Sequence, residues 1–360
     1  MNHSDLNKKS NIILIGAAGH QGREYFQLLK NIYNFKALID NDFGSLKKLY
    51  DSNKYLLLKD INELSKNIDF DIVIICLPHY LHKSITLPLI SSKKTIIKEK
   101  PLAITSNEIQ EYLNEMKKHS NNKLFTIVQR NFNSSFQEAK KNLNSIGKIY
   151  NFSYDYDLNI DSKTTGWRAE FDKSFGGVLI DMGYHILDMI FYFFNGLISV
   201  SAISSYCYAD MKKKSLEDSI NIIMKFKNDI SGIVNINRHS HIKKEVFIIR
   251  GEKGVIEILP TQYYIYDRKG KIILNKQFTI NQAQIKTNMF EYYIKHQNDK
   301  KFLFEHFKHH SNIVLIIEKI YQQIRKKKNN ENNFLYEQRL NLKEDEKTQD
   351  ELNINLGKML

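Results

Sequence analysis

The chain has 360 residues and 42% of them are hydrophobic, which supplies enough apolar surface for the cores of two ordinary domains. Its 53 lysine and arginine residues against 40 acidic ones give a formal net charge of +13, but the basic residues are scattered and accompany no nucleic-acid-binding motif; nucleic-acid partners are therefore not expected, and an anionic small substrate is compatible with the excess. Two cysteines are too few for a disulfide framework and no run of about 18 apolar residues occurs, so we expect a cytoplasmic protein without disulfides or membrane spans.

A dinucleotide-binding unit is predicted at the start of the chain. Residues 11–15 are apolar and β-branched, residues 16–22 read GAAGHQG, and residues 23–31 are amphipathic, which together predict a strand, a glycine turn and a helix. Glycines let backbone amides approach a pyrophosphate at the helix N-terminus, where the helix dipole favours an anion. A second strand at 35–39 ends in Asp40. Its carboxylate would bind the ribose hydroxyls and repel a 2′-phosphate, so NAD is favoured over NADP.

Three further apolar runs, at 71–77, 94–98 and 125–128, continue the alternation of strands and helices. Residues 1–128 are therefore predicted to form an α/β Rossmann domain with a parallel sheet. Ligands of such sheets bind beyond the carboxyl ends of the strands, and four predicted strand ends carry glycines or polar residues there. The residues expected to bind the cofactor are Gly16, Ala18, Gly19, His20, Gln21, Gly22, Asp40, Leu77, Pro78, His82, Glu99 and Lys100.

The chain changes character after residue 128. Strand-like runs occur at 150–158, 198–208, 220–226, 230–237, 246–249, 255–259 and 263–266. Short turns join several of them, which predicts an α+β domain with a large open, mostly antiparallel sheet over residues 129–326. Helices are expected at about 282–297 and 304–326. Residues 327–360 are polar and rich in charge, which is typical of a flexible tail.

The most informative stretch is 178–194, which is apolar on nearly every face and therefore predicts a helix buried all round. Three ionisable residues interrupt it, namely Asp181, His185 and Asp188. At about 100° per residue they fall within roughly 40° to 60° of one another and form one polar stripe. Because buried charges must be paired or neutralised, the stripe is expected to line a cleft. The alternative is a satisfied core histidine with two helix-end carboxylates.

Several motifs in combination resemble one known family. They are Glu99-Lys100-Pro101 after a buried strand, Pro78 with His82, and Gly176-Gly177 followed by Asp181, Gly183, His185 and Asp188. Residues 129–130, 167–168 and 217–218 also fit the pattern. From about residue 10 to 325 the chain is similar to the glucose-fructose oxidoreductase, inositol dehydrogenase and MocA (Gfo/Idh/MocA) family of NAD(P)-dependent sugar oxidoreductases. The longer glycine turn and a GG where GGG is common depart from the family pattern.

The resemblance implies an oxidoreductase acting on CH–OH groups, with hydride transfer between NAD and a hydroxyl or ketone carbon of a sugar, sugar nucleotide or cyclitol. It also implies a homodimer or homotetramer, because the second domain often mediates assembly in the family. Carried over by motif, Lys100 would stabilise the reacting oxygen, Asp181 would bind substrate and orient or charge-balance the histidine, and His185 would be the general acid or base. The residues expected to contact substrate are Lys100, Arg130, Trp167, Arg168, Asp181 and His185.

Other interpretations remain open. Trp167 and Arg168 equally fit a core tryptophan beside a surface arginine. The alternative functions are reduction of a non-sugar carbonyl or diol, and a cofactor-binding regulator or scaffold without catalysis; the joint retention of Lys100, Asp181 and His185 argues against the regulator. No metal is expected, because neither His239 with His241 nor His306 with His310 has an evident third ligand.

Overall fold

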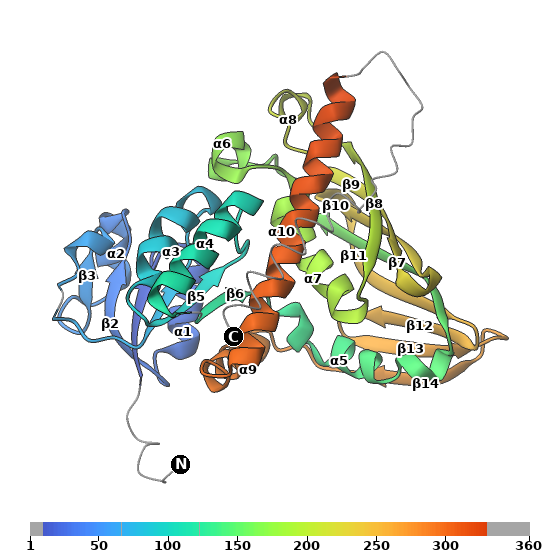
Figure 1. Cartoon of the computed structure of the whole chain (residues 1–360), viewed down its shortest axis with the longest axis horizontal. Helices are drawn as coiled ribbons and strands as arrows, with labels where there is room; N and C mark the ends of the chain where they lie inside the picture. The colour runs from blue at the N-terminus through green and yellow to red at the C-terminus, as the bar shows by residue number, and fades with distance from the viewer. Residues whose placement is uncertain (1–9, 66, 122, 330–360) are drawn as a thin grey trace, which may run out of the picture.

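The computed structural model describes residues 10–65, 67–121 and 123–329. It contains two sheets, and the long helix α10 (Lys300–Asn329) runs between them (Figure 1). This helix extends three residues into the segment predicted as a tail from residue 327; the rest of that segment lies outside the described residues. In the described part of the chain, no helix is both long enough and apolar enough to span a membrane.

The first sheet has six strands in the order β3-β2-β1-β4-β5-β6, and every neighbouring pair is parallel. The strands are β1 (Asn11–Ile15), β2 (Asn34–Ile39), β3 (Leu56–Leu58), β4 (Ile72–Ile75), β5 (Thr95–Glu99) and β6 (Leu124–Ile127). Helices α1 (His20–Leu29), α2 (Phe43–Leu49), α3 (His82–Ile90) and α4 (Ser106–His119) follow strands along the chain. The predicted Rossmann arrangement is thereby confirmed.

Burial on both faces explains the sequence of these strands. In β1, Ile12, Ile13 and Leu14 are all fully buried, although consecutive side chains point to opposite faces of the sheet. A parallel sheet covered on both sides therefore reads as an unbroken apolar run. The three-residue strand β3 was not predicted, because it is too short to produce such a run.

The second sheet has eight strands in the order β14-β13-β12-β11-β7-β10-β9-β8. They are β7 (Ile149–Asn159), β8 (Leu197–Ser205), β9 (Ser219–Phe226), β10 (Ser231–Asn237), β11 (His239–Gly251), β12 (Gly254–Leu259), β13 (Gln262–Asp267) and β14 (Ile272–Gln277). Only the central pair β7 and β10 is parallel, so the predicted mostly antiparallel sheet is confirmed. The edge strand β14 was not predicted, because all six of its residues are exposed and show no alternation of burial.

The remaining helices cover one face of the second sheet and fill the space between the two sheets (Figure 1). They are α5 (Ser134–Lys141), α6 (Phe171–Ser174), α7 (Tyr184–Phe193), α8 (Ala209–Lys213) and α9 (Gln282–Lys295). Helix α10 contacts β6 and α4 on one side and α7 and β8 on the other. It thus brings α7, the central element of the second part, close to the strand ends of the first sheet.

The single helix predicted over 178–194 is divided into two elements. A π-helical turn, Leu179–Gly183, comes first, and the regular helix α7 begins at Tyr184. The prediction of all-round burial holds for most of the stretch, since the side chains of Leu179, Ile186 and Met189 are fully buried. The wider π turn changes the angle between Asp181 and the residues that follow it, and this alters the predicted polar stripe.

Candidate active site

The glycine turn is tightly packed between β1 and α1. Gly16 has a φ of +82°, and a Cβ atom built on it would lie 2.1 Å from the carbonyl oxygen of Cys76. A Cβ atom on Gly22 would lie 2.1 Å from the carbonyl oxygen of Gly16. Both positions therefore need glycine, one for its positive φ and both for the close approach of backbones.

The start of α1 is open to an anionic ligand. Gly19 occupies the N-cap position and provides no side-chain cap, and Gly19 and His20 are both exposed. The first amide N–H groups of a helix have no partner within the helix, and the helix dipole attracts negative charge to them. The turn thus fits the pyrophosphate of a dinucleotide. Gln21, also predicted here, instead accepts a hydrogen bond of 3.0 Å from Lys286 of α9.

Asp40 lies beside this turn, at the end of β2. One carboxylate oxygen accepts a hydrogen bond of 2.9 Å from the backbone N–H of Ala18, and the other accepts one of 3.0 Å from Asp42. These contacts hold an acidic group against the phosphate-binding turn, where a ribose of a dinucleotide would lie. The local geometry therefore fits NAD, although the role of Asp40 stays a prediction.

His82 links the ends of two neighbouring strands. Its Nε2 lies 2.8 Å from the carbonyl oxygen of Leu77, after β4, and its Nδ1 lies 3.2 Å from that of Pro101, after β5. Burial and the nearby positive charge of Lys98 lower the pKa of His82 well below its usual range. A neutral imidazole has one N–H, so the ring donates to one of the two carbonyl groups at a time. His82 thus shapes the crevice rather than reaching into it.

Lys100 follows β5, and the side chain of Lys98 binds the backbone just after it. The buried ammonium group of Lys98 donates to the carbonyl oxygens of Pro101 and Leu102 at 2.9 and 2.7 Å. Lys100 points the other way, toward Asp181, with its Nζ 2.9 Å from the Oδ1 atom and also donating to the backbone oxygen of the same residue. The end of β5 and the turn that precedes α7 therefore meet at this ion pair.

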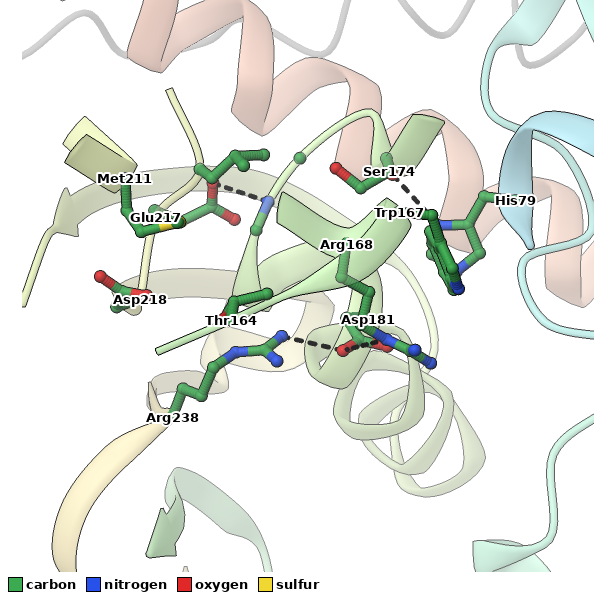
Figure 2. Close-up of a pocket in the computed structure, with 13 residues that line it drawn as sticks. His79, Thr164, Trp167, Arg168, Ser174, Asp181, Met211, Glu217, Asp218 and Arg238 are labelled. Atoms are coloured by element: carbon green, nitrogen blue, oxygen red, sulfur yellow. Dashed lines mark hydrogen bonds and ion pairs between the residues drawn. The ribbon is translucent and has the colours of Figure 1, made fainter. Parts of the chain in front are cut away.

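Two arginines also contact Asp181, as Figure 2 shows. The Nε atom of Arg168 lies 3.2 Å and the Nη2 atom of Arg238 lies 2.8 Å from the same carboxylate oxygen, Oδ2. Burial would raise the pKa of Asp181, but the positive charges of Lys100, Arg168 and Arg238 outweigh this and hold the pKa well below its usual range. Asp181 is therefore ionised at neutral pH.

His185 lies close to this cluster but is not hydrogen-bonded to it. Its Nδ1 atom is buried and has no hydrogen-bond partner among the described residues. Burial, followed by the positive charges of Lys100 and Arg130, lowers the pKa of His185 well below its usual range. The imidazole is thus neutral, which is the state that a proton acceptor requires.

The predicted polar stripe does not form one hydrogen-bonded group. Asp181 was expected to orient or charge-balance His185, and no hydrogen bond joins the two in the described structure, because both carboxylate oxygens of Asp181 accept from Lys100 or the arginines. The negative charge of Asp181 nevertheless acts to raise the pKa of His185, against the larger effect of burial. Asp188 was expected on the same stripe, but it pairs with His309 of α10, with 2.7 Å between His309 Nε2 and Asp188 Oδ1. The π turn ends before His185 and Asp188, so it changes only the angle between Asp181 and these two residues.

Of the other predicted substrate residues, Trp167 and Arg168 line the pocket in Figure 2, whereas Arg130 is already paired. The ring of Trp167 packs edge-on against His79, 4.7 Å between centroids, and the guanidinium of Arg168 lies 4.3 Å from the centre of the Trp167 ring. Arg130 forms an ion pair with Glu245, and the hydroxyl of Tyr154 donates to the same carboxylate at 2.8 Å. Arg130 is therefore held by an ion pair, and its place in substrate binding stays a prediction.

Sequence reasoning did not assign several residues of the pocket, among them His79, Thr164 and Arg238. Arg238 follows β10, and its position at a strand end was the only available signal, because an isolated arginine carries no motif. The Nδ1 atom of His79 lies 3.1 Å from the carbonyl oxygen of Ser174. Burial and the charge of Lys100 lower its pKa to about 3, so it is neutral and donates this hydrogen bond.

The expectation that no metal is bound stays a prediction. The described residues include one group, Asp188, His309 and His310, whose potential ligand atoms all lie within 4.8 Å of one another. The ring of His310 is also hydrogen-bonded to Tyr184, and that of His309 to Asp188. The pair His306 and His310 weighed from the sequence lies in the same region, with ring centroids 4.5 Å apart.

Two family models match the chain. Residues 10–126 match the oxidoreductase family with an NAD-binding Rossmann fold, and residues 136–257 match the GFO/IDH/MocA C-terminal domain. Together they cover nearly all of the first sheet, the second sheet up to β12, and most of the site described above.

Similar curated proteins are oxidoreductases. An uncharacterized oxidoreductase of Bacillus subtilis is 24% identical over 69% of this chain and 74% of its own length. The myo-inositol 2-dehydrogenase of Thermotoga maritima is 24% identical over 59% of this chain and 64% of its own length. The levoglucosan dehydrogenase of Pseudarthrobacter phenanthrenivorans is 25% identical over 52% of this chain and 55% of its own length. The matches to these two dehydrogenases thus span less than two thirds of their lengths.

Solved structures share the fold at lower identity. A levoglucosan dehydrogenase in complex with NADH superposes with a TM-score of 0.74 at 18% identity, covering 89% of this chain and 98% of that one. The WlbA dehydrogenase of Bordetella pertussis, in complex with NADH and UDP-GlcNAcA, superposes with a TM-score of 0.70 at 14% identity, covering 88% of this chain and 97% of that one.

Proposed function

Because this chain belongs to the Gfo/Idh/MocA family of oxidoreductases with an NAD-binding Rossmann fold, we propose that it oxidises or reduces a CH–OH carbon with NAD as cofactor. The substrate class that we propose is a sugar, sugar nucleotide or cyclitol. The inositol and levoglucosan dehydrogenases among the relatives support this class. The observation that carries the proposal is the contact between Lys100 Nζ and Asp181 Oδ1, 2.9 Å long, which joins the cofactor crevice to the turn before His185.

The reaction divides among three side chains. When bound, the nicotinamide supplies or accepts the hydride. Lys100 is 11% exposed, and its ammonium group would stabilise the negative charge that develops on the reacting oxygen, an effect that is strong where water is largely excluded. His185, which is neutral, would accept the hydroxyl proton during oxidation and return it during reduction. Asp181 would hold a neighbouring hydroxyl group of the substrate.

The cofactor would be held by the glycine turn and Asp40. The N–H groups at the start of α1 would bind the pyrophosphate, and Asp40 would accept hydrogen bonds from the ribose hydroxyls. Gly16 and Gly22 keep that surface free of side chains.

A substrate panel tests this proposal. The purified full chain would be saturated with NAD, with NADP in a parallel series, and mixed with sugars, sugar nucleotides and cyclitols while the nicotinamide absorbance band is recorded. We expect cofactor reduction with at least one member of these classes. Cofactor binding without reduction of NAD by any polyol, combined with oxidation of a dihydrodiol by NAD or reduction of a diketone by NADH, would overturn the substrate class. No cofactor turnover with any compound would favour the regulator or scaffold instead.

We also propose that the open face of the eight-stranded sheet forms a homo-oligomer interface. Ile203, Ile223 and Ile233 are 64%, 57% and 47% exposed on this face, and Ile223 pairs directly with Ile233 across β9 and β10. Apolar side chains grouped in this way are typical of an association surface. Sedimentation of Ile223→Asp should show a smaller assembly than wild type, whereas the control Ile32→Asp, 39% exposed after α1, should not change it. A wild-type monomer would contradict the proposal.

A further inference from the structure

Positive charge exceeds negative charge around Asp181. Lys100, Arg168 and Arg238 are three cations that share this single carboxylate, and both arginines contact the same oxygen atom. One of these cations would suffice to neutralise Asp181. The side chain of Arg238 is only 9% exposed, so its charge is largely removed from water and depends on nearby anions for compensation.

The other two acidic residues of the pocket do not offset this excess. Glu217 accepts hydrogen bonds from the backbone N–H groups of Gly177 and Leu179, at 3.1 and 2.9 Å, and from the hydroxyl of Tyr321. Burial raises the pKa of Glu217, and these hydrogen bonds act in the opposite direction.

Asp218 is engaged in the same way. Its carboxylate accepts from the backbone N–H groups of Cys207 and Tyr208, at 3.0 and 3.4 Å, and lies 3.2 Å from His239 Nε2. Its oxygens are therefore directed at the backbone and at a histidine, and no ion pair joins it to either arginine in the described part of the chain.

The two guanidinium groups have donors to spare. Each arginine carries five N–H donors in a planar fork, which matches the two oxygens of a carboxylate or phosphate. Arg168 reaches Asp181 through Nε and Arg238 through Nη2. In Figure 2 they approach Asp181 from different sides within the pocket that Thr164 and His79 also line. Arg168 lies against the face of Trp167 and is 45% exposed, so it is accessible to a ligand.

From this geometry we propose that Arg168 and Arg238 bind an anionic group of the substrate, a carboxylate or a phosphoryl group, beside the reacting hydroxyl. This inference rests on the proposed function, because it names the class of substrate that the same site accepts. In this arrangement Lys100 binds the reacting oxygen, and the two arginines bind a second, negatively charged group of the same ligand. A neutral polyol would leave the two guanidinium groups without the anion that they are arranged to bind.

The inference is tested with matched pairs of ligands. The Kd of each ligand for the NADH-saturated full chain is measured from the change in NADH fluorescence. The pairs are D-glucuronate with D-glucose, and UDP-glucuronate with UDP-glucose, which differ in the carboxylate; D-glucose 6-phosphate represents the phosphoryl group. We expect at least one ligand with the added carboxylate or phosphoryl group to bind about 10- to 100-fold more tightly than its counterpart without that group, the range of a charge-assisted contact. Preference within the UDP pair identifies a carboxylate, and preference for the 6-phosphate identifies a phosphoryl group.

Variants connect the preference to these side chains. The side chain of Arg168 is about half exposed, so the variant Arg168→Gln should fold. It should reduce the preference for the anionic ligand about 10-fold and leave the Kd for NADH unchanged. Arg238→Lys keeps the buried positive charge but lacks the planar guanidinium group. It should also reduce the preference for the anionic ligand. The control Arg268→Gln removes one positive charge from the exposed turn between β13 and β14 and should leave the preference intact.

Equal binding of anionic and neutral partners would overturn the inference, and so would a preference that survives both variants. Failure of every anionic compound to bind would overturn it as well. The proposed function fails separately, if NADH itself does not bind or if no substrate reduces NAD. A protein that binds NADH and oxidises neutral polyols as well as uronates would retain its function and refute only the anion-binding role.

Discussion

At the scale of a single residue, we predict that Asp40 favours NAD over NADP. Replacing it by asparagine keeps the acceptor for Ala18 N–H but removes the negative charge that would repel a 2′-phosphate. We expect Asp40→Asn to shift the ratio of the Kd values for NADP and NAD about 10-fold toward NADP, corresponding to about 1.4 kcal/mol. Titration of nucleotide fluorescence measures both constants.

The neighbouring carboxylate supplies a control for that variant. Asp42 caps α2 by accepting from the backbone N–H of Ser45 at 3.0 Å, and asparagine is also a good cap. Asp42→Asn should therefore leave the ratio of the two Kd values within about 2-fold of wild type. An unchanged ratio in Asp40→Asn would contradict the role given to that residue.

At the residue scale, the sequence was informative where a residue type is required by its backbone or its position at a strand end. Gly16, Gly22, Asp40 and Lys100 could be identified in this way. Arg238 could not, because its contact with Asp181 joins residues 57 positions apart and leaves no spacing pattern. The ion pair of Arg130 with Glu245 joins residues 115 positions apart and leaves no spacing pattern either, and the expected contact of Arg130 with substrate stays a prediction.

At the scale of elements, the packing of the glycine turn gives a sharp prediction. In Gly22→Ala, the added Cβ atom would lie 2.1 Å from the carbonyl oxygen of Gly16, so α1 must move away from the turn. Overpacking of this kind costs about 1 to 3 kcal/mol of unfolding free energy and should weaken NAD binding. Urea unfolding and a cofactor titration test the two effects.

Gly44→Ala in α2 is the matched control. The nearest atom to its added Cβ is the flexible carboxylate of Asp42 at 3.6 Å, an ordinary contact. Alanine is favoured over glycine in a helix, so this variant should be neutral or more stable by up to about 1 kcal/mol. Equal stability and equal NAD affinity in Gly22→Ala and wild type would show that the turn is not packed as described.

The elements themselves were largely predictable, because strands buried on both faces and amphipathic helices leave strong patterns. The π turn Leu179–Gly183 is the unpredicted element that most affects the site. It contains the ordinary helix-compatible residues of a buried segment, so a regular helix was the expected result. The change in winding alters the angle between Asp181, which contacts Lys100, and the residues of α7, where Asp188 pairs with His309.

At the scale of the whole molecule, buried neutral histidines make stability depend on pH. The pKa is lowered by burial at His79, His82, His185, His306 and His310, to about 3 for His79 and His306. Below the unfolded value of about 6.5, the unfolded chain takes up protons that the folded chain does not, so unfolding becomes more favourable as pH falls. Each such histidine contributes about 1.4 kcal/mol per pH unit in this window.

We therefore expect the unfolding free energy to fall by several kcal/mol between pH 7 and pH 5. Glu99 and Glu217, whose pKa values burial raises, act in the opposite direction but are outnumbered. His79→Asn keeps a donor for the carbonyl of Ser174 and should reduce the slope by one histidine's share, whereas His20→Gln at an exposed position should not. Urea unfolding at pH 7 and pH 5 measures the unfolding free energy of each protein. An unfolding free energy that stays constant or rises toward pH 5 would contradict this prediction.

The most direct test of the central claim is the rate of change of the nicotinamide absorbance band in wild type and His185→Ala. Both proteins would be saturated with NAD and mixed with the substrate that the panel identifies. We expect turnover to fall about 10²- to 10⁴-fold, the range for loss of a general acid or base, while the Kd for NAD and the thermal unfolding midpoint stay close to wild type. Unchanged turnover in His185→Ala would show that proton transfer does not depend on this histidine and would contradict the catalytic site proposed for the protein.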